Sequence, residues 1–267
     1  LKNLKRLDEA EISFNKAIEH KTNYAEAYYN LGNLLSDLKR LDEAEASFNK
    51  AIKLKPDHAE THNNLGNILR DLKRFDDAEK SYRKATELKP DYTVAHFNLA
   101  NTLHSLDRLD EAEISFRKTI DLKPDYVEGH NNLGNTLLDL KKLDEAEVSF
   151  NKAIKLNPNL TEAHFNLGII LKDLKKYDEA EVSFNKAIKL KPFFAEAYNN
   201  LGITLSEVTR LNESIACYKK AIEHKPNYVE AHDNLNLTIK LNALLFSIQQ
   251  KRDSAGKTKL NFFNKFY

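Results

Sequence analysis

The sequence predicts an all-α protein, a right-handed superhelical solenoid of stacked 34-residue helix–turn–helix repeats. The first observation is that the six prolines recur every 34 residues, at Pro56, Pro90, Pro124, Pro158, Pro192 and Pro226. The second is a Leu-Gly pair on the same grid, with glycine at positions 32, 66, 134, 168 and 202 and Ala100 in the missing place. The third is the composition: 30% of the residues are charged and the net charge is only +1, which is typical of a soluble, helix-prone chain.

Each repeat is predicted to contain two helices, as residues 59–92 illustrate. Asp57 is a favourable N-cap for the first helix, and Glu60 three residues later would complete a capping box. Asp76 and Glu79 have the same spacing at the expected start of the second helix. The spacing recurs at Asp42/Glu45, Asp110/Glu113, Asp144/Glu147 and Asp178/Glu181. The proline near the end of each unit stops the second helix, because it cannot continue the hydrogen-bond ladder.

The glycine column predicts that the two helices of a repeat approach closely. A glycine inside a helix costs about 1 kcal/mol relative to alanine, so its repetition indicates a steric need. We expect the alanine column of the second helix to lie opposite it, at Ala44, Ala78, Ala112, Ala146 and Ala180. One hairpin cannot bury its apolar face alone, so stability should come from contacts between neighbouring hairpins.

These columns resemble the tetratricopeptide repeat (TPR), whose pattern has an aromatic residue, Leu-Gly, a later alanine, an aromatic residue, alanine and proline. Residues 93–126 read T-V-A-H-F-N-L-A-N-T-L-H-S-L-D-R-L-D-E-A-E-I-S-F-R-K-T-I-D-L-K-P-D-Y. The resemblance covers roughly residues 1–250. It implies a right-handed superhelix with a concave groove lined by the first helix of each repeat.

The repeat grid also predicts the domain organisation. Residues 1–24 form a partial repeat, with the end of a first helix and a second helix, and residues 25–228 form six full repeats. Residues 229–252 form a longer capping helix that ends at residues 253–256, and residues 253–267 form a basic, aromatic tail, disordered or at a cut domain boundary. The chain lacks Met and begins in mid-helix, so we expect more repeats upstream.

Several classes of protein are excluded by the sequence. There is no Gly-rich phosphate loop and no cysteine pair, so we expect no catalytic site, metal or cofactor in this segment. Cys217 is the single cysteine, an inert packing residue that fits a reducing, cytoplasmic compartment. The net charge gives no reason to expect nucleic-acid binding, and no apolar run approaches the ~20 residues of a membrane span.

Five histidines share one column, at His62, His96, His130, His164 and His232, with Tyr28 and Tyr198 in the other repeats. Equivalent positions should lie about 10 Å apart, the packing distance of helices, so these rings cannot converge on one metal ion. We therefore predict that they fill an aromatic packing slot.

Asparagine is the residue type that points to function. It occupies one position in seven consecutive first helices, at Asn30, Asn64, Asn98, Asn132, Asn166, Asn200 and Asn234. It recurs one turn later at Asn33, Asn67, Asn101 and Asn135, on the same helix face. Asparagine is a poor helix former, so helix propensity does not explain it. A carboxamide both donates and accepts hydrogen bonds, which suits a peptide backbone.

The TPR resemblance places this column in the concave groove, where it is similar to the asparagine ladder of O-linked N-acetylglucosamine transferases, which holds extended peptides. A rise of about 10 Å per repeat matches about three residues of extended chain, so seven amides would track roughly 20 residues. The alternative is that the amides only bridge neighbouring helices. One further position alternates between aromatic residues and asparagine, with Tyr29, Phe97 and Phe165 as aromatic members. These rings either form side-chain pockets or record a two-repeat duplication.

The expected groove is acidic, because it carries the column of Glu26, Glu60, Glu128, Glu162, Glu196 and Glu230. The hypothesis is therefore a non-enzymatic scaffold that binds other proteins through extended segments, neutral or basic more than acidic. One alternative is the substrate-recognition arm of a larger glycosyltransferase whose catalytic domain lies outside this segment. Another is self-association through the uncapped N-terminal repeat.

Overall fold

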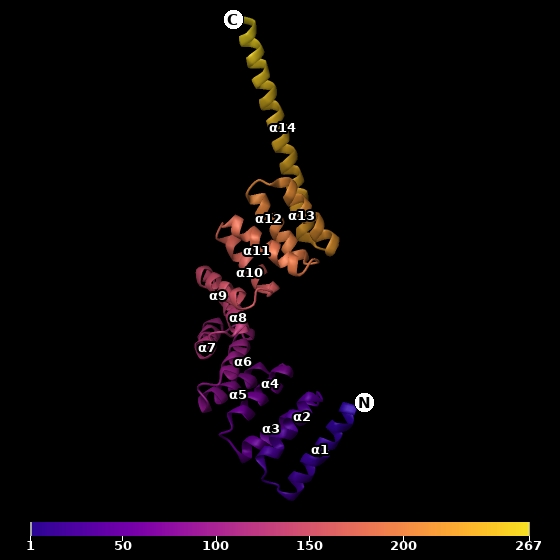
Figure 1. The fold of residues 1–267 in the computed structure, drawn as a ribbon, viewed down its shortest axis with the longest axis vertical. Helices are drawn as coiled ribbons and strands as arrows, with labels where there is room; N and C mark the ends of the chain where they lie inside the picture. Colours follow the sequence, from indigo (N-terminus) through magenta and orange to yellow (C-terminus); the bar gives the residue numbers. More distant parts are fainter. Residues whose placement is uncertain (1, 267) are drawn as a thin grey trace. The chain divides into compact units, whose positions relative to one another are not determined.

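The computed structural model describes the backbone of residues 2–266 and the side chains of residues 7 and 9–251. Within residues 2–266 it contains fourteen α-helices and no strand. The chain divides into two compact units, Leu1–Lys142 and Leu143–Tyr267, which we describe separately. Figure 1 shows the helices in chain order.

Unit 1 contains α1 (Lys2–His20), α2 (Ala25–Asp37), α3 (Leu41–Leu54), α4 (Ala59–Asp71), α5 (Phe75–Leu88), α6 (Thr93–Ser105), α7 (Leu109–Leu122) and α8 (Val127–Asp139). Unit 2 contains α9 (Leu143–Leu156), α10 (Thr161–Asp173), α11 (Tyr177–Leu190), α12 (Ala195–Glu207), α13 (Leu211–His224) and α14 (Val229–Phe266). Within each unit, helices adjacent in the chain pack against each other, as α4 does with α3 and α5. The protein is thus an all-α repeat solenoid, and the superhelical handedness stays a prediction.

The helix starts differ from the predicted caps. Helix α4 has His58, not Asp57, at its N-cap, and α5 has Arg74 there, one residue before Phe75. Neither cap residue makes a capping hydrogen bond from its side chain. Asp76 instead lies inside the first turn, where its negative charge interacts favourably with the positive end of the helix dipole.

The turn inside each hairpin has one residue with positive φ: Lys39, Lys73, Asp107, Lys141, Lys175 and Thr209, with φ from 58° to 62°. In the first hairpin the amide of Lys39 donates to the carbonyl of Ser36, and that of Arg40 donates to the carbonyl of Leu35. These two bonds form a Schellman motif, which satisfies carbonyls at the end of the first helix. The motif repeats every 34 residues without the glycine that usually occupies this position.

The nearest neighbours of the glycine column are aromatic rings of the second helix, which the sequence did not predict. A Cβ atom at Gly66 would lie 2.6 Å from Cε1 of Tyr82, and one at Gly168 would lie 2.6 Å from Cε1 of Phe184. The same contact holds for Gly32 with the ring of Phe48. The alanine column is fully buried, and its place opposite the glycines stays a prediction. The aromatic column of the second helix therefore explains the glycine column of the first.

Ion pairs join successive second helices. Arg74 bonds to Glu45 at 2.8 Å, and Lys176 bonds to Glu147 at 2.8 Å. Each pair spans 29 residues, and the set consists of Arg40–Glu11, Arg74–Glu45, Arg108–Glu79, Lys142–Glu113, Lys176–Glu147 and Arg210–Glu181. Glu79 was expected in a capping box, and it is held instead by Arg83 and Arg108.

The two chain ends also differ from expectation. Helix α1 runs unbroken from Lys2 to His20, so the predicted end of a preceding helix is absent from residues 2–20. Helix α14 does not end at residues 253–256 but continues to Phe266, because one glycine does not interrupt a helix that has no proline. Large apolar side chains of α14 are exposed, among them Leu237, Leu244 and Phe246.

Candidate functional site

The asparagine columns of unit 1 form hydrogen bonds between neighbouring first helices. Asn64 Nδ2 on α4 donates to Asn33 Oδ1 on α2 at 2.8 Å. The same bond joins Asn98 to Asn67 at 3.2 Å, and Asn132 to Asn101 at 2.8 Å. The two columns that the sequence places on one helix face therefore meet across helices, with the second column of one repeat accepting from the first column of the next.

In unit 2 the amides have different partners. Asn234 Nδ2 donates to Asn199 Oδ1 at 3.1 Å. Asn200 Nδ2 donates to the backbone carbonyl of Glu196 at 3.0 Å, and its oxygen accepts from Lys172 Nζ at 3.4 Å. Asn166 is half-buried and has interaction partners. The equivalents of Asn33 on α10 and α12 are Ile169 and Ile203, which cannot accept.

The amides differ in how far their hydrogen-bonding capacity is used. A carboxamide has two N–H donors and two acceptor lone pairs. Asn98 Nδ2 donates to both Asn63 and Asn67, and Asn67 Oδ1 accepts from the Tyr82 hydroxyl as well, so these groups are fully used. Asn30 is half-buried and makes no hydrogen bond within the described residues. The network thus fixes the orientation of most amides and leaves polar atoms that can reach another chain.

At the alternating position the aromatic rings are half-buried and pack on other rings. The Phe97 ring packs on Phe116 at 5.9 Å and on Tyr126 at 4.9 Å between centroids. Phe165 does the same with Phe184 and Phe194, at 6.1 and 4.7 Å. In the intervening repeats the asparagines at 63, 131 and 199 are buried, and Oδ1 of Asn131 has no hydrogen-bond partner among the described atoms. Aromatic pairs and buried amides therefore alternate along the stack.

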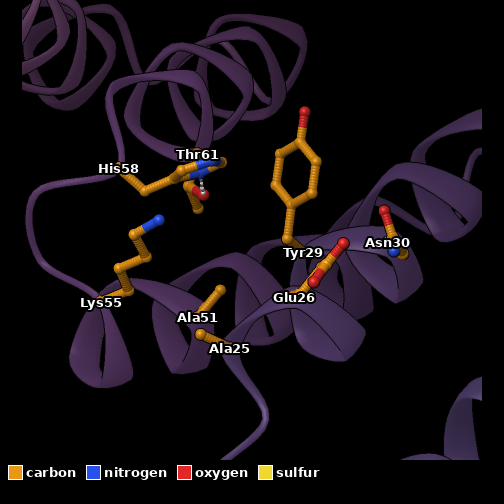
Figure 2. A pocket seen from close by; sticks show the side chains of 8 residues that line it. All are labelled: Ala25, Glu26, Tyr29, Asn30, Ala51, Lys55, His58 and Thr61. Carbon is orange, nitrogen blue, oxygen red and sulfur yellow. Dashed lines mark hydrogen bonds between the residues drawn. The ribbon is translucent and has the colours of Figure 1, made fainter.

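A pocket of about 330 Å³ lies beside Tyr29, the remaining aromatic residue of the alternating position. It is formed by α2, α3 and the start of α4, and its lining residues are Ala25, Glu26, Tyr29, Asn30, Ala51, Lys55, His58 and Thr61. Figure 2 shows Lys55 and His58 on one side of it and Glu26 and Asn30 on the other. His58 stands edge-on to the Tyr29 ring at 5.1 Å, and its Nδ1 lies 2.6 Å from Thr61 Oγ1.

A second, smaller pocket of about 140 Å³ lies on the same face of unit 1. Three predicted site residues line it, Asn101, Asn132 and Asn135, together with His104 and Phe116. His104 Nε2 lies 3.0 Å from a carboxylate oxygen of Asp139. Both pockets therefore include members of the asparagine columns.

The acidic column is partly neutralised in the folded protein. Lys89 Nζ donates to Glu60 at 2.9 Å, and Lys225 Nζ donates to Glu196 at 2.7 Å. These hydrogen bonds lower the pKa of both carboxyl groups, Glu60 and Glu196. Sequence inspection missed these lysines, which come from the turn before the next repeat and meet the acids only after folding.

The histidine column forms polar bonds as well as packing contacts. Nε2 of His96 lies 3.0 Å from the carbonyl oxygen of Pro90, and His164 has the same bond to Pro158 at 3.0 Å. The other members, His62, His130 and His232, bond to Pro56, Pro124 and Pro226. Burial lowers the pKa of His96 and His164. The column therefore links five of the first helices to the turn before them.

Three further properties of the described residues bear on a metal site, a reactive thiol and a membrane-spanning helix. Among the described residues no three His, Cys, Asp or Glu side chains gather in a way that could hold a metal ion. Cys217 is half-buried, and burial raises the pKa of its thiol to about 11. In the described part of the chain, no helix combines the length and apolar character needed to cross a bilayer.

Comparison with known proteins follows the repeat grid. Models of the tetratricopeptide repeat match residues 23–91, 57–125, 127–160, 161–194 and 183–216. A comparison with curated proteins finds no match.

Among solved structures, YrrB, described as a TPR protein with an unusual peptide-binding site, is 27% identical with a TM-score of 0.64, over 70% of this chain and 96% of YrrB. MamA is 24% identical with a TM-score of 0.61, over 64% of this chain and 95% of MamA. The pilF protein of Pseudomonas aeruginosa is 19% identical with a TM-score of 0.66, over 78% and 95%. The last two likenesses concern the fold alone. With the matched models covering most of its length, the chain belongs to the tetratricopeptide-repeat family.

Proposed function

We propose that this chain is a protein-interaction scaffold that binds extended peptide segments along the face bearing the asparagine columns. The observation that carries the proposal is the set of amides held by inter-helix hydrogen bonds, two of which, Asn101 and Asn132, line a pocket. A pinned amide loses little conformational freedom when a ligand binds, which favours affinity. The similarity to YrrB, a peptide-binding TPR protein, supports the same class of function.

The ligand is expected to bind through its backbone. Amide donors and acceptors match peptide bonds whatever the side chains are, so affinity should depend weakly on sequence outside the pockets. Glu128 and Glu162 make no ion pair within the described residues, whereas Glu60 and Glu196 are paired with lysines. A residual negative charge favours neutral or basic segments over acidic ones.

The test uses a library of displayed random peptides of about 12 residues, long enough to span about four repeats when extended. A selected binder is then measured against the variant Asn30→Ala, which removes an amide without breaking a hydrogen bond of the fold. We expect affinity to fall about fivefold, the net contribution of one hydrogen bond of ~1 kcal/mol. The matched control is Asn49→Ala, an exposed asparagine on α3, which should leave affinity unchanged. Equal affinities for both variants, or a library without binders, would contradict the proposal.

The alternative of a substrate-recognition arm of a glycosyltransferase rests on the same asparagine column and stays a prediction. It requires a catalytic domain in the same reading frame, which sequencing of the complete gene would reveal. Self-association through α1 also stays a prediction, and it requires a mass that rises with protein concentration.

A further inference from the structure

The pocket beside Tyr29 differs from the equivalent places in other repeats because of His58. The residue at this turn position is tyrosine at 24, 92, 126 and 228, phenylalanine at 194 and leucine at 160, so His58 is the one histidine in the column. In the next repeat Lys89 lies 4.9 Å above the Tyr92 ring and also bonds to Glu60 at 2.9 Å. Lys225 does the same with Tyr228 and Glu196, at 4.7 and 2.7 Å. Lysine, ring and carboxylate together fill the space in those repeats.

At the pocket beside Tyr29 the lysine, ring and carboxylate do not come together in this way. His58 is smaller than tyrosine, and its bond to Thr61 holds the ring against α4. Thr61 is itself buried and replaces the alanine or glycine of the other repeats. Within the described residues Lys55 lies over no ring and forms no ion pair, and Glu26 forms none either. Two substitutions in the same repeat thus leave a cavity with one free cation and one free anion.

The lining selects a type of side chain. A ligand with a single charge would meet a like charge on one side, Lys55 or Glu26. A neutral group that both donates and accepts can bond to both, because the ammonium only donates and the carboxylate only accepts. The Tyr29 and His58 rings and the methyl groups of Ala25 and Ala51 form the walls, which suits a flat aromatic ring.

We infer that this pocket is a specificity subsite for a tyrosine side chain of the bound peptide. The phenol ring packs beside Tyr29 and His58, and its hydroxyl donates to Glu26 while accepting from Lys55. The inference rests on the proposed function for the rest of the peptide, but the pocket can be tested without one.

The probe is p-cresol, the side chain of tyrosine as a free molecule, titrated into the full chain and followed by amide and methyl NMR spectra. Toluene, acetate and butylammonium are titrated in parallel. We expect p-cresol to shift signals of Tyr29, Thr61 and Ala51, and to bind at least about fivefold more tightly than toluene, since it adds hydrogen bonds to charged groups.

Two variants test whether p-cresol binds in the pocket beside Tyr29. His58→Tyr introduces the tyrosine that four other repeats have here and should abolish p-cresol binding while the fold persists. His62→Tyr places the same residue four positions later, outside the lining, where tyrosine already occurs at 28 and 198. It should bind p-cresol as the parent does. Tighter binding of acetate or butylammonium than p-cresol, or unchanged binding by His58→Tyr, would overturn the inference. If p-cresol binds and no peptide does, the pocket inference stands and the scaffold proposal fails. If peptides bind and p-cresol does not, the scaffold proposal stands and the pocket inference fails.

Discussion

At the scale of single residues, the turn inside each hairpin carries local strain. L-residues in the left-handed region suffer a contact between Cβ and the following carbonyl oxygen, worth roughly 1–2 kcal/mol. Lysine occupies this position in four of the six turns, and Thr209 occupies the last. A β-branched residue is the least suited to positive φ, so Thr209 is the most strained of the six.

Thr209→Gly is therefore expected to stabilise the protein by about 1 kcal/mol, despite the entropy that glycine adds to the unfolded chain. Lys175→Gly, at the equivalent turn with φ of 60°, should give a smaller gain. Urea unfolding followed by circular dichroism measures both. A loss of stability in Thr209→Gly would mean that the Thr209 side chain makes a favourable contact that outweighs the strain.

The glycine column permits a second test. Gly66→Ala would place a methyl group 2.6 Å from the Tyr82 ring, which is buried and cannot move aside. The expected cost is about 1–3 kcal/mol, typical of overpacking, in spite of the better helix propensity of alanine. Gly129→Ala is the matched control, since its nearest contact is 3.1 Å to a methyl group of Ile120. If both variants lose the same stability in urea unfolding, ring contact does not explain the column.

At the scale of elements, two sets of side chains tie helices together. The Arg/Lys–Glu pairs join successive second helices, but their exposed partners contribute little each, since solvent screens them. The histidine–proline bonds join five of the first helices to the turn before them, and His164 is mostly buried. The buried histidines should therefore make stability depend on pH.

The sign follows from the lowered pKa of His96 and His164, whose neutral forms are favoured by burial. The unfolded chain binds protons near pH 6.5 and the folded protein only at lower pH, so stability is full above about pH 6.5 and falls as the pH drops below it. The double variant His96→Tyr/His164→Tyr, with the tyrosine found in other repeats, should flatten this slope. Urea midpoints at several pH values between about 5.5 and 7.5 measure it. An unchanged slope in the variant would assign the pH dependence to other groups.

At the scale of the whole molecule, stability should be a sum of hairpins and their nearest-neighbour contacts. Helices such as α5 and α6 have partners on both sides, whereas residues 243–251 of α14 have only exposed side chains. Amide protection should follow this difference, because local opening costs less where fewer groups are buried.

Hydrogen–deuterium exchange at low protein concentration is therefore expected to be fastest in residues 243–251 and at least tenfold slower in α5 and α6, a difference of about 1.4 kcal/mol in opening free energy. Protection of residues 243–251 equal to that of α5 would contradict this expectation. Protection that rises with protein concentration would show that a second copy covers Leu244 and Phe246.

The candidate site was predictable in its composition but not in its geometry. The asparagine columns are visible as spacing, and the structure brings Asn33 and Asn64 to 2.8 Å. That bond joins two helices, so no local pattern reveals it. His58 and Thr61 are visible in the sequence only as departures from the repeat, and their shared pocket depends on how α2, α3 and α4 pack.

The sequence by itself determined the period, the helical class and the helix ends set by proline, because these depend on neighbours within one turn. It also determined which residues share a helix face. Only the tertiary structure decided that Gly66 faces Tyr82 and that Lys89 neutralises Glu60. Both are contacts between side chains far apart in the sequence, which no local pattern reveals.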